Sequence, residues 1–227
     1  NSLYIGIPKE VSFQECRIPL TPLSVALLVN NGHKVVIETG AGVGANFSDK
    51  DYSEQGAQIS FNKKDVYAAD IIVKIAPPTL EEIGLMHKGQ TLISALQVGT
   101  LKDSILKALL HKKINALCFE HLRDEGNILS VVRAMGEIVG SASIFIAAEY
   151  LSSAFGGKGL MLGGFTGVPP TEIVILGAGT VGEYAARTAL SLGAEVKVFD
   201  SSIFRLRRLQ NNLGSRVFTS VMQPIVL

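Results

Sequence analysis

The sequence has two cysteines, nearly equal numbers of acidic and basic residues, and no long uncharged run. Cys16 and Cys118 lie far apart without metal-like spacing, so we expect a reduced compartment and no metal site. The 21 Lys and Arg residues against 20 Asp and Glu argue against a basic surface for nucleic acid. The uncharged, apolar run near residues 138–148 is shorter than the ~20 residues that a membrane span requires. These absences predict a soluble, cytoplasmic protein.

Short apolar segments that alternate with helical ones dominate the chain. Its 227 residues are 47% hydrophobic and 18% charged, which suits one large domain or two small ones. Strands buried on both faces should be rich in Ile, Val and Leu. Five segments of the first half fit this pattern: residues 3–7, 34–37, 70–75, 91–95 and 115–119. The first of them stands where a signal peptide would be, so we expect no signal peptide there. The alternation of strands with helices predicts a doubly wound parallel sheet.

Helix signals divide the chain into two Rossmann-like α/β units. Thr21-Pro22 is typical of a helix start and Gly32 of its end, and residues 101–112 have helical apolar spacing. A long Ala- and Ser-rich helix is expected from residue 134 to about 155. Such a helix is a natural connector, so we place a substrate domain at residues 1–130 and a nucleotide-binding domain at 131–227.

The clearest chemical signal is a glycine motif between two apolar strands, at residues 172–176 and 195–199. Gly177 permits a tight turn, Gly179 has no side chain to keep a pyrophosphate from the backbone, and Gly182 lets a helix lie close to the sheet. The unpaired N–H groups of the helix N-terminus favour phosphate. Asp200, at the end of the second strand, would accept hydrogen bonds from ribose hydroxyls. The pattern predicts a dinucleotide site.

The cofactor predicted for this site is NAD, bound by residues 177–182 together with Asp200 and Arg205. The Asp200 carboxylate would repel the 2′-phosphate of NADP, although the arginines at 205, 207 and 208 weaken that preference. A third strand at residues 216–218 follows. Dinucleotide folds commonly have about six strands, so we expect the second sheet to be incomplete in this chain. The full set of expected cofactor-binding residues is Gly177, Ala178, Gly179, Thr180, Val181, Gly182, Asp200 and Arg205.

A second glycine cluster, Gly40-Ala-Gly-Val-Gly44, also follows a strand. It lacks a third glycine at the right step, and polar residues rather than an apolar helix come after it. We interpret it as a structural turn.

Polar residues follow several strands of the first unit, at the edge where ligands bind in open α/β sheets. Lys74 ends an otherwise apolar strand, so it should be paired, exposed in a cleft, or reach water from an edge strand. The planar guanidinium of Arg17 suits a substrate carboxylate, but it could instead pair with Glu10 or Glu15 on the surface. Gln97 follows the predicted strand at residues 91–95, and its amide can form hydrogen bonds but cannot transfer a proton near neutral pH. Glu120 and His121 occupy the equivalent place after the next strand, and His121 is either an acid–base group or an exposed loop histidine.

Together these residues resemble the alanine dehydrogenase and pyridine-nucleotide transhydrogenase family. The matching strings are collinear and cover nearly the whole chain. In addition to the nucleotide motif they are Ile5-Gly-Ile-Pro-Lys-Glu10, Arg17-Ile-Pro-Leu-Thr-Pro22, Gly40-Ala-Gly42, Asp70-Ile-Ile-Val-Lys74, Ala134-Met-Gly-Glu-Ile-Val-Gly140 and Gly156-Gly-Lys-Gly-Leu-Met-Leu-Gly-Gly164.

The resemblance implies specific roles for four residues. Arg17 would hold the substrate carboxylate, Lys74 would bind and polarise the keto or imino group, and Met135 would border the site. Gln97 stands where the dehydrogenases carry a catalytic histidine, which transhydrogenase subunits also lack. Proton transfer could fall to an aspartate that the family carries beyond this segment, to His121, or to no residue.

Three functions follow from this resemblance. The first is an NAD-dependent dehydrogenase that interconverts L-alanine with pyruvate and ammonium. The second is the NAD(H)-binding α-subunit component of a proton-translocating transhydrogenase, and the third is a non-catalytic NAD-binding homologue. The family also implies a homo-oligomer packed through the long helix, acting on a small amino or keto acid.

Overall fold

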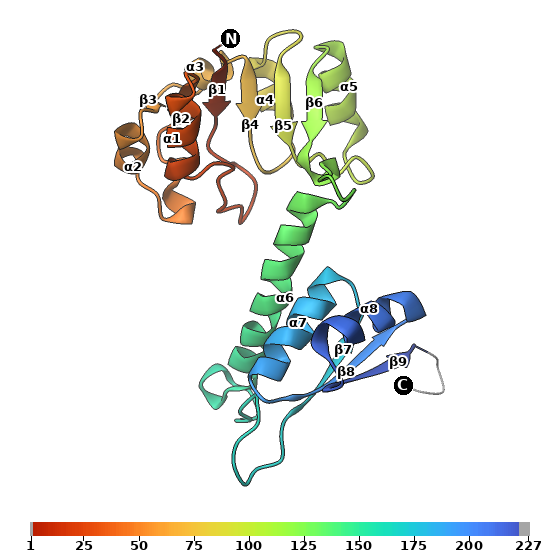
Figure 1. Cartoon of the computed structure of the whole chain (residues 1–227). Coiled ribbons are helices and arrows are strands. Elements are labelled where there is room, and N and C mark those ends of the chain that lie inside the picture. The colour runs from red at the N-terminus through yellow and green to blue at the C-terminus, as the bar shows by residue number, and fades with distance from the viewer. Residues whose placement is uncertain (1, 223–227) are drawn as a thin grey trace. The chain divides into compact units, whose positions relative to one another are not determined.

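The computed structural model describes residues 2–222, which form two compact α/β units (Figure 1). The first unit ends at Leu122 and the second begins at Arg123. Each unit has a parallel sheet and a core of its own. The predicted fold class is confirmed.

The sheet of the first unit has six parallel strands in the order β3-β2-β1-β4-β5-β6. Because all six strands are parallel, their carboxyl ends lie at one edge of the sheet. The strand bounds are β1 Tyr4–Ile7, β2 Lys34–Glu38, β3 Gln58–Ser60, β4 Ile71–Val73, β5 Thr91–Ser94 and β6 Asn115–Cys118.

Helices cover this sheet on two sides. Along β2, Val35 and Ile37 join one buried cluster and Val36 joins the other, as alternating side chains of a strand must. The first cluster includes Val25 of α1, and the second includes Leu109 of α5. The helix bounds are α1 Pro22–Asn30, α2 Asp49–Glu54, α3 Lys63–Tyr67, α4 Leu80–Leu85 and α5 Asp103–His111, with short 3-10 turns at η1 Val43–Ala45 and η2 Phe119–His121.

The second unit contains the long helix and a sheet of three parallel strands in the order β7-β8-β9. Its core joins Ile144 of the long helix to alanines of α7, valines of β8 and leucines of α8. The element bounds are α6 Ser130–Leu151, η3 Ser153–Phe155, β7 Glu172–Leu176, α7 Thr180–Ser191, β8 Glu195–Asp200, α8 Ile203–Leu213 and β9 Val217–Val221.

Helix α6 begins and ends four residues earlier than the sequence pattern predicts. It starts directly after the turn that the Arg123–Leu129 bridge closes. It stops at Leu151 because the chain folds back there, and the Gly157 N–H donates to the Ser152 carbonyl. A side chain at Gly157 would lie 2.1 Å from the Tyr150 carbonyl oxygen, so this return requires glycine.

A glycine also allows α6 to lie close to α7. A Cβ atom at Gly140 would lie 2.3 Å from the carbonyl oxygen of Val181. At Gly136, one turn earlier, the same atom would lie 3.4 Å from the Thr180 methyl group, which is ordinary contact. The close approach therefore depends on Gly140 far more than on Gly136.

By length and composition alone, α6 could cross a membrane. Its 22 residues exceed the uncharged run seen in the sequence because Arg133, Glu137 and Glu149 fall within it. A core helix of a soluble protein meets the same test, and α6 packs on α7 along its small residues. The soluble, cytoplasmic state stays a prediction.

Candidate functional site

Polar side chains follow four neighbouring strands of the first unit at their carboxyl ends. Glu10 comes after β1, Lys74 after β4, Gln97 after β5 and Glu120 after β6. The two carboxylates connect adjacent strands. Glu10 Oε1 accepts the Ile75 N–H, and Glu120 Oε1 accepts the N–H groups of Leu96 and Gln97 at 3.0 and 2.8 Å. Glutamates thus fix the backbone from which Lys74 and Gln97 project.

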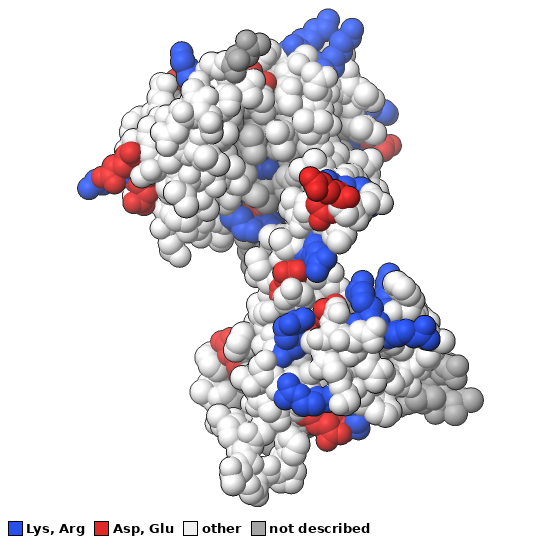
Figure 2. All heavy atoms as spheres, in the orientation of Figure 1, with Lys and Arg blue, Asp and Glu red and all other residues white. Residues whose placement is uncertain are grey.

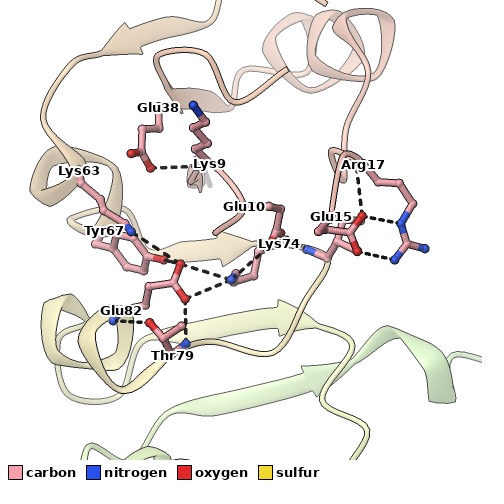
Figure 3. Close-up of polar contacts among 11 residues, drawn as sticks. Lys9, Glu10, Glu15, Arg17, Glu38, Lys63, Tyr67, Lys74, Thr79 and Glu82 are labelled. Atoms are coloured by element: carbon pink, nitrogen blue, oxygen red, sulfur yellow. Dashed lines mark hydrogen bonds and ion pairs between the residues drawn. The ribbon is translucent and has the colours of Figure 1, made fainter. Parts of the chain in front are cut away.

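Lys74 is fully buried, and its ammonium lies between two carboxylates (Figure 3). Its Nζ is 3.3 and 3.2 Å from the two carboxylate oxygens of Glu82 and 3.3 Å from Glu10 Oε2. Because β4 lies between β1 and β5, Lys74 does not reach water from a sheet edge. Of the three alternatives that the sequence left open for Lys74, the structure shows the one in which Lys74 is paired with acidic side chains.

Further contacts fix Glu82 in place. Its carboxylate accepts the Tyr67 hydroxyl at 3.0 Å and the Thr79 N–H at 2.8 Å, and its own N–H donates to Thr79 Oγ1. Burial raises the Glu82 pKa, but the Lys74 charge and these donors outweigh it, so the pKa is lowered overall. Burial and the Glu82 charge raise the pKa of Tyr67. The cluster therefore holds an ionised carboxylate beside an ammonium.

Arg17 is exposed and forms a bidentate ion pair with Glu15. Its Nε and Nη2 lie 2.7 and 2.6 Å from the two oxygens of that carboxylate. The hydrogen bond with Arg17 lowers the pKa of Glu15 and raises that of Arg17. The sequence left open a pair with a nearby glutamate, and the structure has this pair.

Gln97 is exposed and has a left-handed backbone with φ of 47°. It lines a groove of about 700 Å³ together with Thr100, Lys102 and the Pro77–Pro78–Thr79 segment. Its neighbour Glu120 has a second oxygen that is buried and accepts no hydrogen bond in the described residues. His121 is exposed at the end of η2, as the simpler interpretation of this loop histidine expected. No hydrogen bond joins Gln97 or His121 to Lys74 in the described part of the chain.

In the second unit, the glycine motif forms the turn that the sequence predicts. Gly177 has φ of 112°, a conformation that side chains disfavour. A Cβ atom on Gly182 would lie 1.8 Å from the Gly177 carbonyl oxygen, whereas one on Gly179 would point into open space. Gly179 caps α7 and has no side chain to occupy its first N–H groups. This turn can bind a diphosphate.

Asp200 is 4% exposed and braces the same turn. Its two oxygens accept the N–H groups of Ala178 and Ser202, both at 2.7 Å, and these bonds lower its pKa. Arg205 lies 3.9 Å from Asp200 and is largely exposed. Arg208 donates to the Ala178 carbonyl at 3.3 Å. Figure 2 shows basic side chains gathered over α8, the helix that carries both arginines.

A groove of about 960 Å³ runs between α6, β7 and α7. It includes the glycines of the motif together with Thr180, Val181 and Arg208. Met135 is half-buried on α6, and its place beside a substrate stays a prediction. The groove has the size of a small-molecule site and contains the open N–H groups of the helix start.

The other glycine cluster already contains a carboxylate. Asp49, at the start of α2, accepts the Gly40 N–H at 2.8 Å and the Thr39 hydroxyl at 2.6 Å. A phosphate would meet this negative charge, so the geometry agrees with a structural turn.

Sequence reasoning missed the acidic partners of Lys74. Thr79-x-x-Glu82 is a capping-box pattern, which could have placed Glu82 at a helix start but not beside Lys74. Glu10 and Glu15 were considered only as surface partners of Arg17. Glu10 is instead buried against Lys74, with its side chain 5% exposed.

Models of two domains match the chain. The alanine dehydrogenase/PNT N-terminal domain matches residues 6–139 and the corresponding C-terminal domain matches residues 143–225. The chain belongs to the alanine dehydrogenase/PNT family. The resemblance inferred from the motifs is therefore confirmed.

Relatives named alanine dehydrogenase align over almost the whole chain. The protein from Methanococcus maripaludis is 39% identical over 96% of this chain and 58% of its own length. The protein from Bilophila wadsworthia is 37% identical over 95% of this chain and 57% of its own length. The chain therefore spans less than two thirds of these relatives.

Two solved structures share the fold. An L-alanine dehydrogenase superposes with a TM-score of 0.88 and 39% identity, covering 96% of this chain and 60% of that one. A transhydrogenase from Sinorhizobium meliloti has a TM-score of 0.81 and 25% identity, covering 98% and 64%. Both branches of the family are thus structurally similar to this chain.

Proposed function

We propose that this protein is an NAD-dependent oxidoreductase of the alanine dehydrogenase type, which interconverts L-alanine with pyruvate and ammonium. The observation that carries the proposal is the buried Lys74 amino group, which lies 3.3 Å from Glu10 and 3.2 Å from Glu82 at the ligand-binding edge of the sheet. The similarity to alanine dehydrogenases supports the choice of substrate.

At the substrate end, the two cations have different tasks. The planar guanidinium of Arg17 suits the carboxylate that alanine and pyruvate share. Lys74 would place its positive charge at the keto or carbinolamine oxygen, where negative charge develops. Met135 would border this site, and Gln97 could position a substrate group by hydrogen bonding.

At the cofactor end, the turn from Gly177 to Gly182 would bind the diphosphate of NAD. Asp200 would accept from the adenosine ribose, and Arg205 would lie beside it. NAD, when bound, supplies the hydride acceptor and donor for the reaction. The Asp200 carboxylate would repel a 2′-phosphate, which favours NAD over NADP.

The second candidate is the NAD(H)-binding component of a transhydrogenase. Gln97 favours it, because an amide cannot transfer a proton near neutral pH and the resemblance implies a histidine there in the dehydrogenases. The same residue supports a non-catalytic NAD-binding homologue. We also propose a cytoplasmic homo-oligomer that acts on small molecules.

Oxidation of NADH, followed by absorbance with pyruvate and ammonium, separates these candidates. We expect turnover that Lys74→Ala abolishes and that Gln97→His increases. Lys50→Ala is the control, because Lys50 forms an exposed pair with Glu54 on α2. Absence of turnover in a preparation that binds NADH would contradict the dehydrogenase.

A further inference from the structure

Both cations assigned to the substrate are already paired with carboxylates of this chain. Lys74 contacts Glu82 and Glu10, and Arg17 contacts Glu15 (Figure 3). The two arrangements differ in how firmly the acids are held, and that difference determines which pair can open for a ligand.

The partner of Lys74 is fixed from several directions. The side chain of Glu82 is 1% exposed and accepts hydrogen bonds from Tyr67 and from the Thr79 backbone as well as from Lys74. Moving it would leave several buried polar groups without partners, which is costly. Lys74 therefore keeps this partner when a ligand arrives.

The partner of Arg17 has no comparable anchor. Within residues 2–222, all the hydrogen bonds to the Glu15 carboxylate come from Arg17 itself, namely from Nε, Nη2 and the backbone N–H. The Arg17 side chain is 55% exposed, and Glu15 lies only two residues away in the same loop. The Glu15 side chain is itself only 13% exposed, but turning it into water would break hydrogen bonds with Arg17 alone among the described residues.

Glu15 also occupies the geometry that a ligand needs. Nε and Nη2 form the edge of the guanidinium that binds a carboxylate with two parallel hydrogen bonds. Both are taken by Glu15 in the described structure. A second carboxylate can use this edge only after Glu15 leaves.

We infer that Glu15 is an internal carboxylate that occupies the Nε–Nη2 edge of the Arg17 guanidinium until the substrate carboxylate replaces it. This inference rests on the proposed function for the identity of the substrate. Glu15 thereby affects specificity, because an incoming group must bind Arg17 better than a tethered carboxylate does. A neutral amide cannot bind Arg17 better than the Glu15 carboxylate does. An α-keto acid can, because its keto oxygen also interacts with the Lys74 charge.

The test compares Glu15→Gln with Glu54→Gln, a matched control in an exposed pair with Lys50. Loss of a competing ion pair should lower the KM for pyruvate about threefold to tenfold in Glu15→Gln. The kcat should stay within about twofold, because the contact is lost before the chemical step. Glu54→Gln should change neither constant. An unchanged or higher KM in Glu15→Gln would overturn the inference, because Glu15 would then position Arg17 rather than compete for it.

Pyruvate binding to the NADH-saturated protein, measured calorimetrically without ammonium, separates the two proposals. If Glu15→Gln binds pyruvate more tightly but no turnover occurs, the inference stands and the dehydrogenase proposal fails. If turnover occurs while Glu15→Gln leaves the affinity for pyruvate unchanged, the dehydrogenase proposal stands and the inference about Glu15 fails. Binding in neither protein would overturn the inference. With Arg17→Lys as background, the effect of Glu15→Gln should disappear, since it acts through the Arg17 guanidinium.

Discussion

Glu82 shows how one buried carboxylate can stabilise a whole sheet edge. It accepts hydrogen bonds from Tyr67, Thr79 and Lys74, which belong to three different segments of the first unit. We expect Glu82→Gln to lower the free energy of unfolding by about 2–4 kcal/mol, because it leaves the buried ammonium with one charged partner. Denaturant titration measures this. Glu81→Gln, at the exposed neighbouring position, should behave like the wild type.

The same side chain predicts a dependence on pH. The pKa of Glu82 is lowered from its ordinary value of 4.5, so its stabilising effect is present above that value. It is lost as the pH falls through the lowered pKa. The difference in unfolding free energy between wild type and Glu82→Gln should therefore be constant near neutral pH and shrink as the pH falls below 4.5. A difference that grew in acid would contradict the assigned ionisation.

At the scale of elements, the contact of α6 with α7 provides a sharp comparison. A methyl group at Gly140 would clash with the Val181 carbonyl, whereas one at Gly136 would make ordinary contact. We expect Gly140→Ala to destabilise the protein by about 1–3 kcal/mol despite its better helix propensity. Gly136→Ala should be neutral or slightly stabilising. Thermal unfolding of the two variants measures the contrast, and equal effects would show that the helices do not meet as described.

The sequence predicted eight of the nine strands in the described residues, because each falls in a short, largely apolar segment. It missed β3, Gln58–Ser60, where a single large apolar residue lies between polar ones. Its pairing with β2 comes from tertiary structure rather than from a local apolar run. Helix α6 was displaced by four residues, because its start lacks a side-chain cap that sequence could show.

The candidate site was predictable only in part, for a physical reason. The glycine turn and Asp200 are contiguous in sequence with their strands, so spacing is enough to place them. The partners of Lys74 come from residues 64 positions before it and 8 after it, since Glu10 and Glu82 meet only through the sheet order. Sequence periodicity carries no information on such contacts.

At the scale of the whole molecule, each compact unit has its own buried core. A substitution buried in one core is therefore expected to act on that unit. Hydrogen exchange followed by mass spectrometry should show faster exchange in residues 2–122 for Glu82→Gln and in residues 123–222 for Gly140→Ala. Equal acceleration of both units by either variant would mean that the two cores unfold as one.

The position of Asp49 affects which of the two glycine-rich turns can bind an anion. Both glycine-rich turns follow a parallel strand, yet in one of them the next helix supplies an acid, Asp49, that accepts the Gly40 N–H and the Thr39 hydroxyl. In the other turn the acid, Asp200, ends the second strand and accepts the N–H groups of Ala178 and Ser202, and no side chain of the described residues caps the start of α7. Selectivity between two similar loops thus depends on where a resident negative charge sits, rather than on how many glycines each contains.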